Sequence, residues 1–184
     1  MNEAKVRTGR PRFTGVHTYD DPQGRFQFRY PWDWEESELD DDLDGVIVRP
    51  EVDEDATYVA IWAKALETSV VAEDLPELKS GFDQGLLQLP DAEILKAEEN
   101  TYNNIVKVER EFTFTEDGHT RKRRAWALYA DYWQFLVVFQ GATVEEYEYW
   151  LPMATTASPP STCRTRCGSP PTRRSTRCSR SPRT

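Results

Sequence analysis

Residues 104–140 have the sequence NIVKVEREFTFTEDGHTRKRRAWALYADYWQFLVVFQ, in which β-branched and aromatic residues recur through three runs. Runs of this composition favour extended strands. Asp117 and Gly118 separate the first two runs, and an Asp-Gly pair is typical of a type I′ turn because both central positions need positive φ. A β-hairpin is therefore expected there, followed by a third strand. The predicted strands are 104–115, 119–130 and 133–140.

The last of these strands has apolar residues on both faces. Side chains alternate between the two faces of a strand. One face carries Trp133, Phe135, Val137 and Phe139, and the other carries Leu136 and Val138. A strand that is apolar on both faces is typical of a position covered on both sides. We expect it at the centre of the sheet.

Upstream of these strands the apolar spacing changes to that of a helix. Five residues fall on one helical stripe: Leu75, Leu78, Phe82, Leu86 and Leu89. Asp74 and Glu77 resemble a capping pair at its start, and Pro90 ends it. Gly81 and Gly85 are four residues apart and share a face, and each costs about 1 kcal/mol relative to Ala inside a helix. We expect close packing of the helix on the sheet to explain both glycines.

Further strands and a second helix complete the pattern. Thr143 and Glu146 fit a capping box that opens a short helix presenting Val144, Tyr147 and Leu151, and Pro152 is expected to end it. The remaining predicted strands are 25–30, 45–48, 57–63 and 92–98. The class predicted is α/β (α+β), with about six strands in an antiparallel sheet sandwiched between helices.

The order of these elements and the residues between them resemble the PsbP-like superfamily, which is named after an extrinsic subunit of the photosystem II oxygen-evolving complex. The resemblance covers residues 19–153. Its carriers are Tyr19 with Asp20, the phrase RFQFRYPWDW at 25–34, the amphipathic helix, and YWQFLVVFQ at 132–140. It implies an antiparallel sheet between helices, in a family of assembly factors, chaperone-like binders, a small-GTPase binder and bacterial lipoproteins. No catalytic residue is shared among those activities, so none is carried over.

Charge and composition narrow the function classes. The chain of 184 residues has a net charge of −9, but residues 154–184 hold seven Arg and no acid, which leaves residues 1–153 at −16. Because nucleic-acid affinity comes mainly from Lys and Arg replacing counterions, binding of DNA or RNA by this body is disfavoured. No stretch approaches the ~18 apolar residues of a membrane span, and the N-terminus has no apolar signal core. All cysteines lie after residue 153, so a cytoplasmic location is expected.

An acidic segment, residues 40–51, matches the spacing of a Ca²⁺-binding EF-hand loop. The candidate ligands are Asp40, Asp42, Asp44 and Glu51, with Gly45 at the turn position. An EF-hand needs a helix on each side, whereas here Pro50 lies inside the segment and 45–48 is a predicted strand. We therefore expect an acidic turn and no cofactor, while a Ca²⁺-responsive or small-ligand-binding protein stays open as an alternative.

The basic run Arg121-Lys-Arg-Arg124 could form a phosphate-binding patch. A two-residue turn at Asp117-Gly118 would instead place Glu111 opposite Arg124, with Lys122 diagonal to Glu111. Cross-strand pairing of opposite charges is the better interpretation. His17 and His119 have no nucleophile or second histidine near them in the sequence, so we expect no enzyme. An enzyme of unrecognised type remains a further alternative.

Two tryptophans are the candidate partner contacts. Trp32 and Trp34 flank Asp33 after Pro31, so they are expected to alternate onto one face near the edge of the sheet. A second interpretation is that they cover a helix. The function predicted from all these features is a non-catalytic binding or assembly-factor domain with an unknown protein partner.

The two ends of the chain are expected to lie outside the domain. Residues 1–18 are polar and basic and are interpreted as a flexible arm. Residues 154–184 are rich in Pro, Ser and Arg, where the family pattern ends on a strand, and are interpreted as a disordered, frameshifted reading. When 154–184 is back-translated into codons and the reading frame is shifted to start at each third base, the new frame encodes apolar residues at 158, 161, 163, 167 and 169. A genuine basic tail is the alternative.

Overall fold

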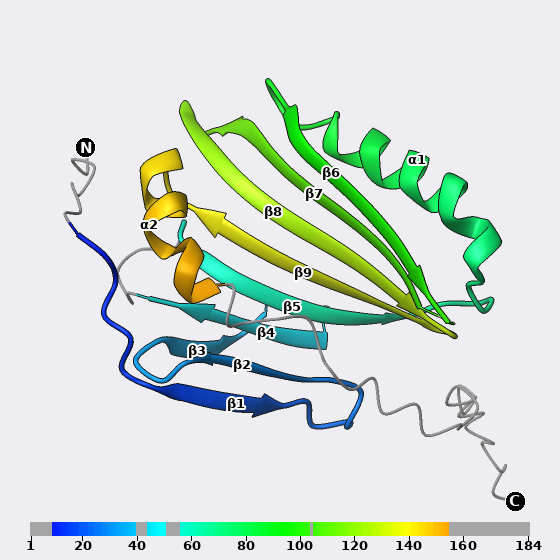
Figure 1. Ribbon diagram of the computed structural model, residues 1–184, viewed down its shortest axis with the longest axis horizontal. Helices are drawn as coiled ribbons and strands as arrows, with labels where there is room; N and C mark the ends of the chain where they lie inside the picture. Colours follow the sequence, from blue (N-terminus) through cyan, green and yellow to red (C-terminus); the bar gives the residue numbers. More distant parts are fainter. Residues whose placement is uncertain (1–8, 40–43, 51–55, 104, 155–184) are drawn as a thin grey trace, which may run out of the picture.

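A strongly twisted antiparallel sheet forms the body of the molecule (Figure 1). The computed structural model describes residues 9–39, 44–50, 56–103 and 105–154. The described strands are β1 Val16–Asp20, β2 Gln27–Pro31, β3 Glu35–Glu38, β4 Asp44–Arg49, β5 Tyr58–Ala65, β6 Glu93–Tyr102, β7 Ile105–Glu116, β8 His119–Ala130 and β9 Trp133–Gly141. Seven pair in the order β3-β4-β5-β9-β8-β7-β6, and β1 pairs with β2 in a separate hairpin. Every pairing is antiparallel, which confirms the expected class.

The meander from β6 to β9 follows the sequence closely. Asp117 and Gly118 have φ values of 52° and 77°, as a type I′ turn requires, and Glu116 pairs with His119 across the turn. With β9 fourth in the order of seven strands, the expected central position is confirmed. The long register of β7 on β8 then places each charged residue opposite a defined partner.

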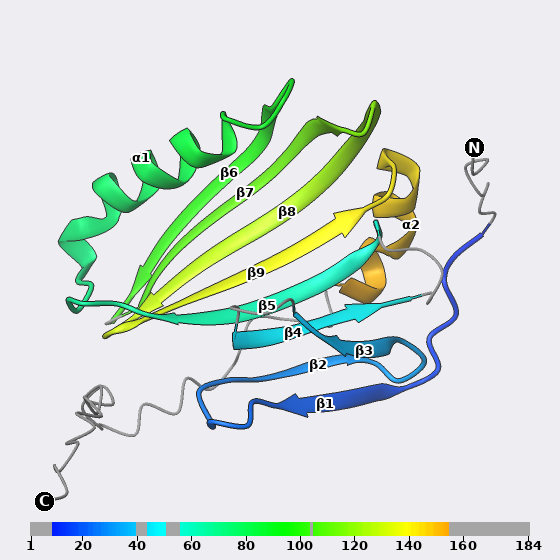
Figure 2. The same cartoon turned by 180° about the vertical axis from the view of Figure 1, so that it is seen from behind.

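Two helices and the β1–β2 hairpin cover the two faces of this sheet. The first helix, α1 (Leu75–Leu86), follows a single 3-10 turn, η1 (Ala72–Asp74), and the second, α2 (Val144–Ala154), follows β9. Figure 2 shows α1 on one side and α2 with the hairpin on the other. Phe135, Val137 and Phe139 of β9 belong to the core on the hairpin side, while Val138 and Leu136 belong to the α1 side. Both faces of β9 are therefore covered, as its composition predicts.

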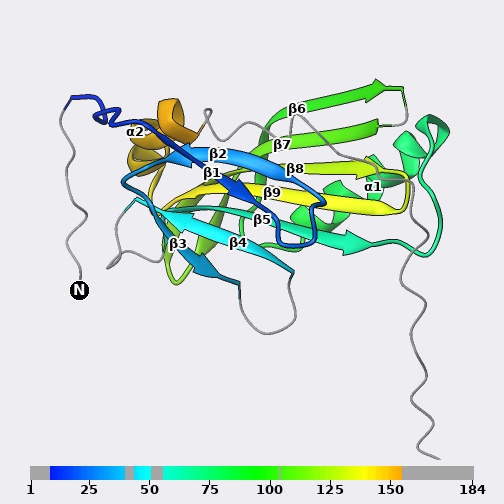
Figure 3. The same cartoon turned by 90° about the horizontal axis from the view of Figure 1, so that it is seen from below.

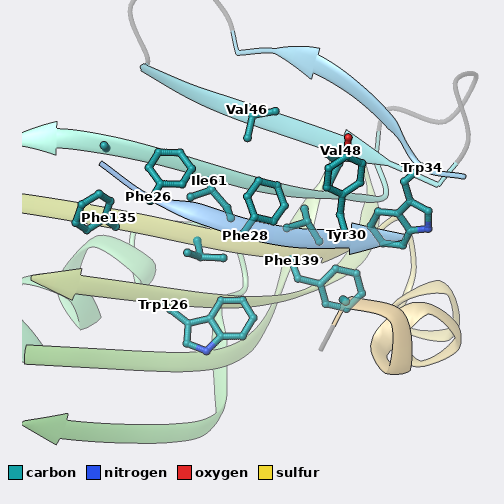
Figure 4. Packing of buried hydrophobic residues seen from close by; sticks show 14 of the residues in the cluster. Phe26, Phe28, Tyr30, Trp34, Val46, Val48, Ile61, Trp126, Phe135 and Phe139 are labelled. Atoms are coloured by element: carbon teal, nitrogen blue, oxygen red, sulfur yellow. The ribbon is translucent and has the colours of Figure 1, made fainter. Parts of the chain in front are cut away.

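The main core lies between the hairpin and the sheet (Figure 4). Phe28 and Tyr30 of β2, with Phe26 just before it, are buried against the sheet. The ring of Phe26 meets that of Phe135 edge-on, with centroids 6.0 Å apart. The half-buried strand predicted at 25–30 is thus confirmed, and it anchors the hairpin.

The nine described strands exceed the seven predicted ranges because two short strands, β1 and β3, escape the sequence pattern. β1 consists largely of exposed residues and β3 is the acidic stretch Glu35–Glu38, so neither has an apolar period. The expectation that residues 1–18 form a flexible arm is wrong for 16–18. Those residues pair with 29–31, and the hairpin thus begins inside the predicted arm.

The helix α1 packs its predicted apolar stripe on the sheet, but two details differ from expectation. Leu75, Leu78 and Phe82 pack against the core over β7 and β8. Gly81 and Gly85 are exposed, and a Cβ added at either would meet nothing within 4 Å. Close packing therefore does not explain these glycines. The Asp74 carboxylate caps the preceding turn instead, where it accepts a hydrogen bond of 2.9 Å from the Val71 amide.

The helix α2 opens as predicted and continues further than predicted. Thr143 Oγ1 accepts a hydrogen bond of 3.2 Å from the amide of Glu146. Tyr147 is fully buried, and its ring stacks on Phe139 at 4.7 Å between centroids. The helix runs through Pro152 to Ala154, so Pro152 does not end it.

Glycine is required where α2 meets the sheet. A Cβ at Gly141 would lie 2.3 Å from the Tyr147 backbone nitrogen, closer than nonbonded atoms approach.

In the part of the chain that the structure describes, no helix is long and apolar enough to cross a membrane. The proposed frameshifted segment is 154–184; Ala154 ends α2 and is buried, and the rest of the segment lies outside the described residues.

Candidate partner-binding surface

Trp32 lies in the turn that leads from β2 to β3. The Trp34 amide donates a hydrogen bond of 3.1 Å to the Pro31 carbonyl, which closes the turn. This bend breaks the alternation of the strand. Trp32 is consequently 56% exposed, whereas Trp34 is only 4% exposed. The two tryptophans do not share a face, so that expectation is wrong.

Trp32 is held in place by His17 of β1 and by Gly15, the residue before β1. The Trp32 amide donates to the Gly15 carbonyl at 3.2 Å, continuing the hairpin pairing by one step. Gly15 has φ +132°, and a Cβ there would lie 3.6 Å from Trp32 Cδ1. His17 stacks against the indole with 6.4 Å between centroids and 26° between planes. Glycine is thus favoured by the positive φ, whereas a Cβ would make only an ordinary van der Waals contact with the ring.

Gly15 and His17 are site residues that the sequence analysis missed, because it placed both in the arm. Neither has a pattern of its own. The available signal is the register of β1 on β2, in which His17 pairs with Tyr30. Extending that register by two residues brings Gly15 opposite Trp32.

Trp34 is a core residue and not a partner contact. Its ring packs edge-on against Trp150 of α2 with centroids 5.7 Å apart, and Figure 4 shows it at the end of the main core. Its Nε1 finds no hydrogen-bond acceptor among the described residues. The alternative interpretation, that an aromatic residue here covers a helix, therefore holds for Trp34 but not for Trp32.

A row of exposed acids follows Trp32. Asp33 is exposed, as are Glu35, Glu36 and Glu38 of β3. The Tyr30 hydroxyl donates to Glu36 at 3.0 Å. Burial of Tyr30, together with this hydrogen bond to a carboxylate, raises the pKa of the phenol to about 12. The surface around Trp32 is therefore aromatic and anionic.

Of the four candidate Ca²⁺ ligands, Asp44 alone lies within the described residues. Asp40, Asp42 and Glu51 lie outside the described residues. The Asp44 carboxylate accepts hydrogen bonds from the Arg25 guanidinium and, at 2.7 Å, from Gln23 Nε2. The bond from Arg25 lowers the pKa of Asp44. The Asp44 carboxylate is thus already paired with the Arg25 guanidinium. No group of three metal-ligating side chains is found within the described ranges.

Arg25 explains why Asp44 is held in this way. The guanidinium also binds Asp21, whose carboxylate oxygens are 2.6 and 2.8 Å from Arg25 Nη2 and Nε. It lies over the Trp133 ring at 5.5 Å. The three contacts join the hairpin turn to β4 and β9. The described part of this segment therefore has a structural role.

Three of the four residues in the basic run on β8 pair with acids, namely Arg121, Lys122 and Arg124, whereas Arg123 donates to Gln140. Glu111 lies opposite Arg124, and Lys122 Nζ is 2.9 Å from Glu111 Oε1 on the diagonal. Arg124 reaches Glu109, with Nε 2.5 Å from its Oε1. The cross-strand interpretation is confirmed. Because three of the four cations are paired with acids, a phosphate-binding patch finds little support here.

The comparisons with known proteins identify a fold. No family model and no curated protein matches the sequence. The solution structure of cyanobacterial PsbP (CyanoP) from Synechocystis matches with a TM-score of 0.55 and 13% identity, over 83% of this chain and 94% of that one. LpqN, a protein involved in cell envelope biogenesis of Mycobacterium tuberculosis, matches with a TM-score of 0.50 and 12% identity, over 70% and 76%. This chain has the PsbP-like fold.

Proposed function

We propose that this chain is a non-catalytic protein-binding domain of the assembly-factor kind, with Trp32 at the centre of its contact surface. The observation that carries the proposal is a large aromatic side chain, 56% exposed, that the fold holds in place. Tryptophan is among the residues most enriched at the energetic centres of protein interfaces.

The contacts that hold Trp32 reduce the side-chain entropy that it would lose on binding a partner. Ordering a free side chain on association costs about 0.5–1.5 kcal/mol. Before a partner arrives, the Gly15 carbonyl already holds the Trp32 backbone and the His17 ring stacks on the indole. More of the apolar contact energy is then available for affinity.

Two other functions find less support. A Ca²⁺-responsive protein would need Asp44 to release Arg25, which is itself buried. An enzyme would need reactive groups, yet the buried charges on the sheet are held in closed ion pairs. Lys122 with Glu111, joined by the Tyr147 hydroxyl at 3.1 Å, is an example. Such pairs serve packing between β7, β8 and α2.

The test is affinity capture from the native host with three forms of the chain. The wild type and Trp32→Ala are compared with Tyr102→Ala, a matched control whose ring is 74% exposed at the opposite end of the sheet. We expect the wild type and the control to capture one stoichiometric partner, and Trp32→Ala to lose at least about fivefold of it. All three should unfold at the same temperature.

Two outcomes would contradict the proposal. If no stoichiometric partner is recovered at any of several salt concentrations, the chain is not a protein-binding domain of this kind. If Trp32→Ala captures the partner as well as the wild type does, the contact surface lies elsewhere.

A further inference from the structure

We propose that the partner supplies a basic, extended segment that adds as a further strand to the open edge of β3. The inference rests on the proposed function, and it specifies the chemistry of the partner and its mode of binding.

The first support is the position of β3. It stands last in the order of the seven-stranded sheet and pairs with β4 alone among the described strands. Figure 3 shows β3 as the outermost strand at this end of the sheet. An edge strand presents unpaired backbone donors and acceptors, which an extended peptide can pair with.

The second support is the charge along that edge. Glu36 and Glu38 pair with Val48 and Val46, two residues of the main core, so both acids belong to the same face of the sheet. Both are exposed. In an added strand, residues two apart share a face and lie opposite these acids. Basic side chains at alternate positions are therefore the complementary pattern.

The third support is Trp32, which precedes β3 by three residues. The face of an indole attracts cations as well as apolar groups. Its exposed ring extends the anionic edge at one end, beside Asp33. A basic segment that follows β3 would thus meet an aromatic contact at the turn.

Two other arrangements are disfavoured by charge and shape. A second copy of the chain would bring together two chains of net charge −9, in which residues 1–153 of each carry −16. The opposite edge, β6, is interrupted by a bulge between Ile94 and Lys96, and Lys96 already pairs with Glu98 at 2.6 Å. Bulges and edge lysines oppose strand addition. The basic segment should therefore prefer β3.

The experiment titrates the full chain with a synthetic hexapeptide, acetyl-Lys-Val-Lys-Val-Lys-Val-amide, followed by amide NMR at low salt. We expect the largest shifts at the amides of 35–38 and at the Trp32 indole. Glu36→Gln with Glu38→Gln keeps the acceptor for Tyr30 but removes two charges, and should weaken binding about five- to tenfold. The matched control, Glu93→Gln with Glu98→Gln on β6, should leave the affinity unchanged.

Two further peptides separate strand addition from charge attraction alone. A peptide of the same charge with alternate amides N-methylated cannot complete the ladder and should bind at least about tenfold more weakly. The version with Glu in place of Lys should not bind. Affinity for the parent peptide should fall as salt is added.

The inference is overturned if the N-methylated peptide binds as tightly as the parent, or if the β3 variant binds as tightly as the β6 control. It is also overturned if the native partner needs Trp32 yet ignores Glu36→Gln with Glu38→Gln, in which case the proposed function stands. Conversely, a peptide that binds to β3 while no partner is captured contradicts the proposed function alone.

Discussion

Arg110 is the buried charge that joins α1 to the sheet. Its side chain is 1% exposed. Nε and Nη2 donate to the two oxygens of Asp83 on α1 at 2.6 and 3.1 Å, and Nη2 also donates to Glu99 on β6 at 2.7 Å. Nη1 donates to the Glu109 carbonyl at 2.6 Å. We predict that replacing this residue destabilises the domain more than any surface charge does.

The magnitude follows from the surroundings. Arg110→Met keeps much of the apolar volume but leaves Asp83 without its cation, while Glu99 keeps Lys79 at 3.0 Å. Removing one member of a buried ion pair costs about 3–5 kcal/mol. The Asp83 and Glu99 side chains are 26% and 24% exposed, so water recovers part of this energy. We expect a loss of about 2–3 kcal/mol, or roughly 5–10 °C in Tm.

Urea and thermal unfolding followed by circular dichroism measure this loss. The control is Lys96→Met, a member of an exposed pair whose Lys side chain is 58% exposed, and it should leave stability nearly unchanged. Adding Asp83→Asn to Arg110→Met removes the carboxylate left without a cation and should recover part of the loss. An Arg110→Met variant as stable as the control would refute the reasoning.

Four further predictions follow from other parts of the molecule. Gly81→Ala and Gly85→Ala should each raise the free energy of unfolding by about 0.5–1 kcal/mol in urea titrations, because both sites are open; a loss would show that this face of α1 is covered. Val137→Asp should unfold the domain by burying a carboxylate, and wild-type thermal stability would mean that β9 is misplaced. Burial raises the pKa of Glu111, but hydrogen bonds from Lys122 and Tyr147 bring it below its usual value of 4.5, so its stabilisation is full above that pH and is lost as the pH falls through the folded pKa. Glu111→Gln should flatten this pH dependence of unfolding, and an unchanged profile would contradict it. Resequencing codons 150 to 160 should reveal a one-base shift, whereas clean reads of the printed frame would establish the tail as native.

The meander was predictable because its determinants are local. An Asp-Gly pair sets the turn, and the turn sets the register that brings Glu111 opposite Arg124. The two-sided apolar pattern of 133–140 predicts a central strand for the same reason, since each face needs cover. The apolar stripe of α1 is local as well.

The errors lie where an element or a contact has no apolar pattern of its own in the sequence. β1 and β3 have no apolar period, so their pairing was invisible until β2 and β4 were in place. Gly81 and Gly85 look like packing glycines, yet the helix turns them to solvent. Arg110 gave no signal, because its acids come from α1 and β6, 27 and 11 residues away.

For the candidate site, the sequence by itself determined that two tryptophans follow Pro31 and that acids surround them. Only the tertiary structure decided that Trp34 is buried against Trp150 and that Trp32 is exposed. The physical reason is the turn at 31–34, which rotates neighbouring side chains to opposite environments through one backbone hydrogen bond. Local periodicity describes a straight strand, and it does not predict a bend held by the carbonyl of Gly15, the residue before β1.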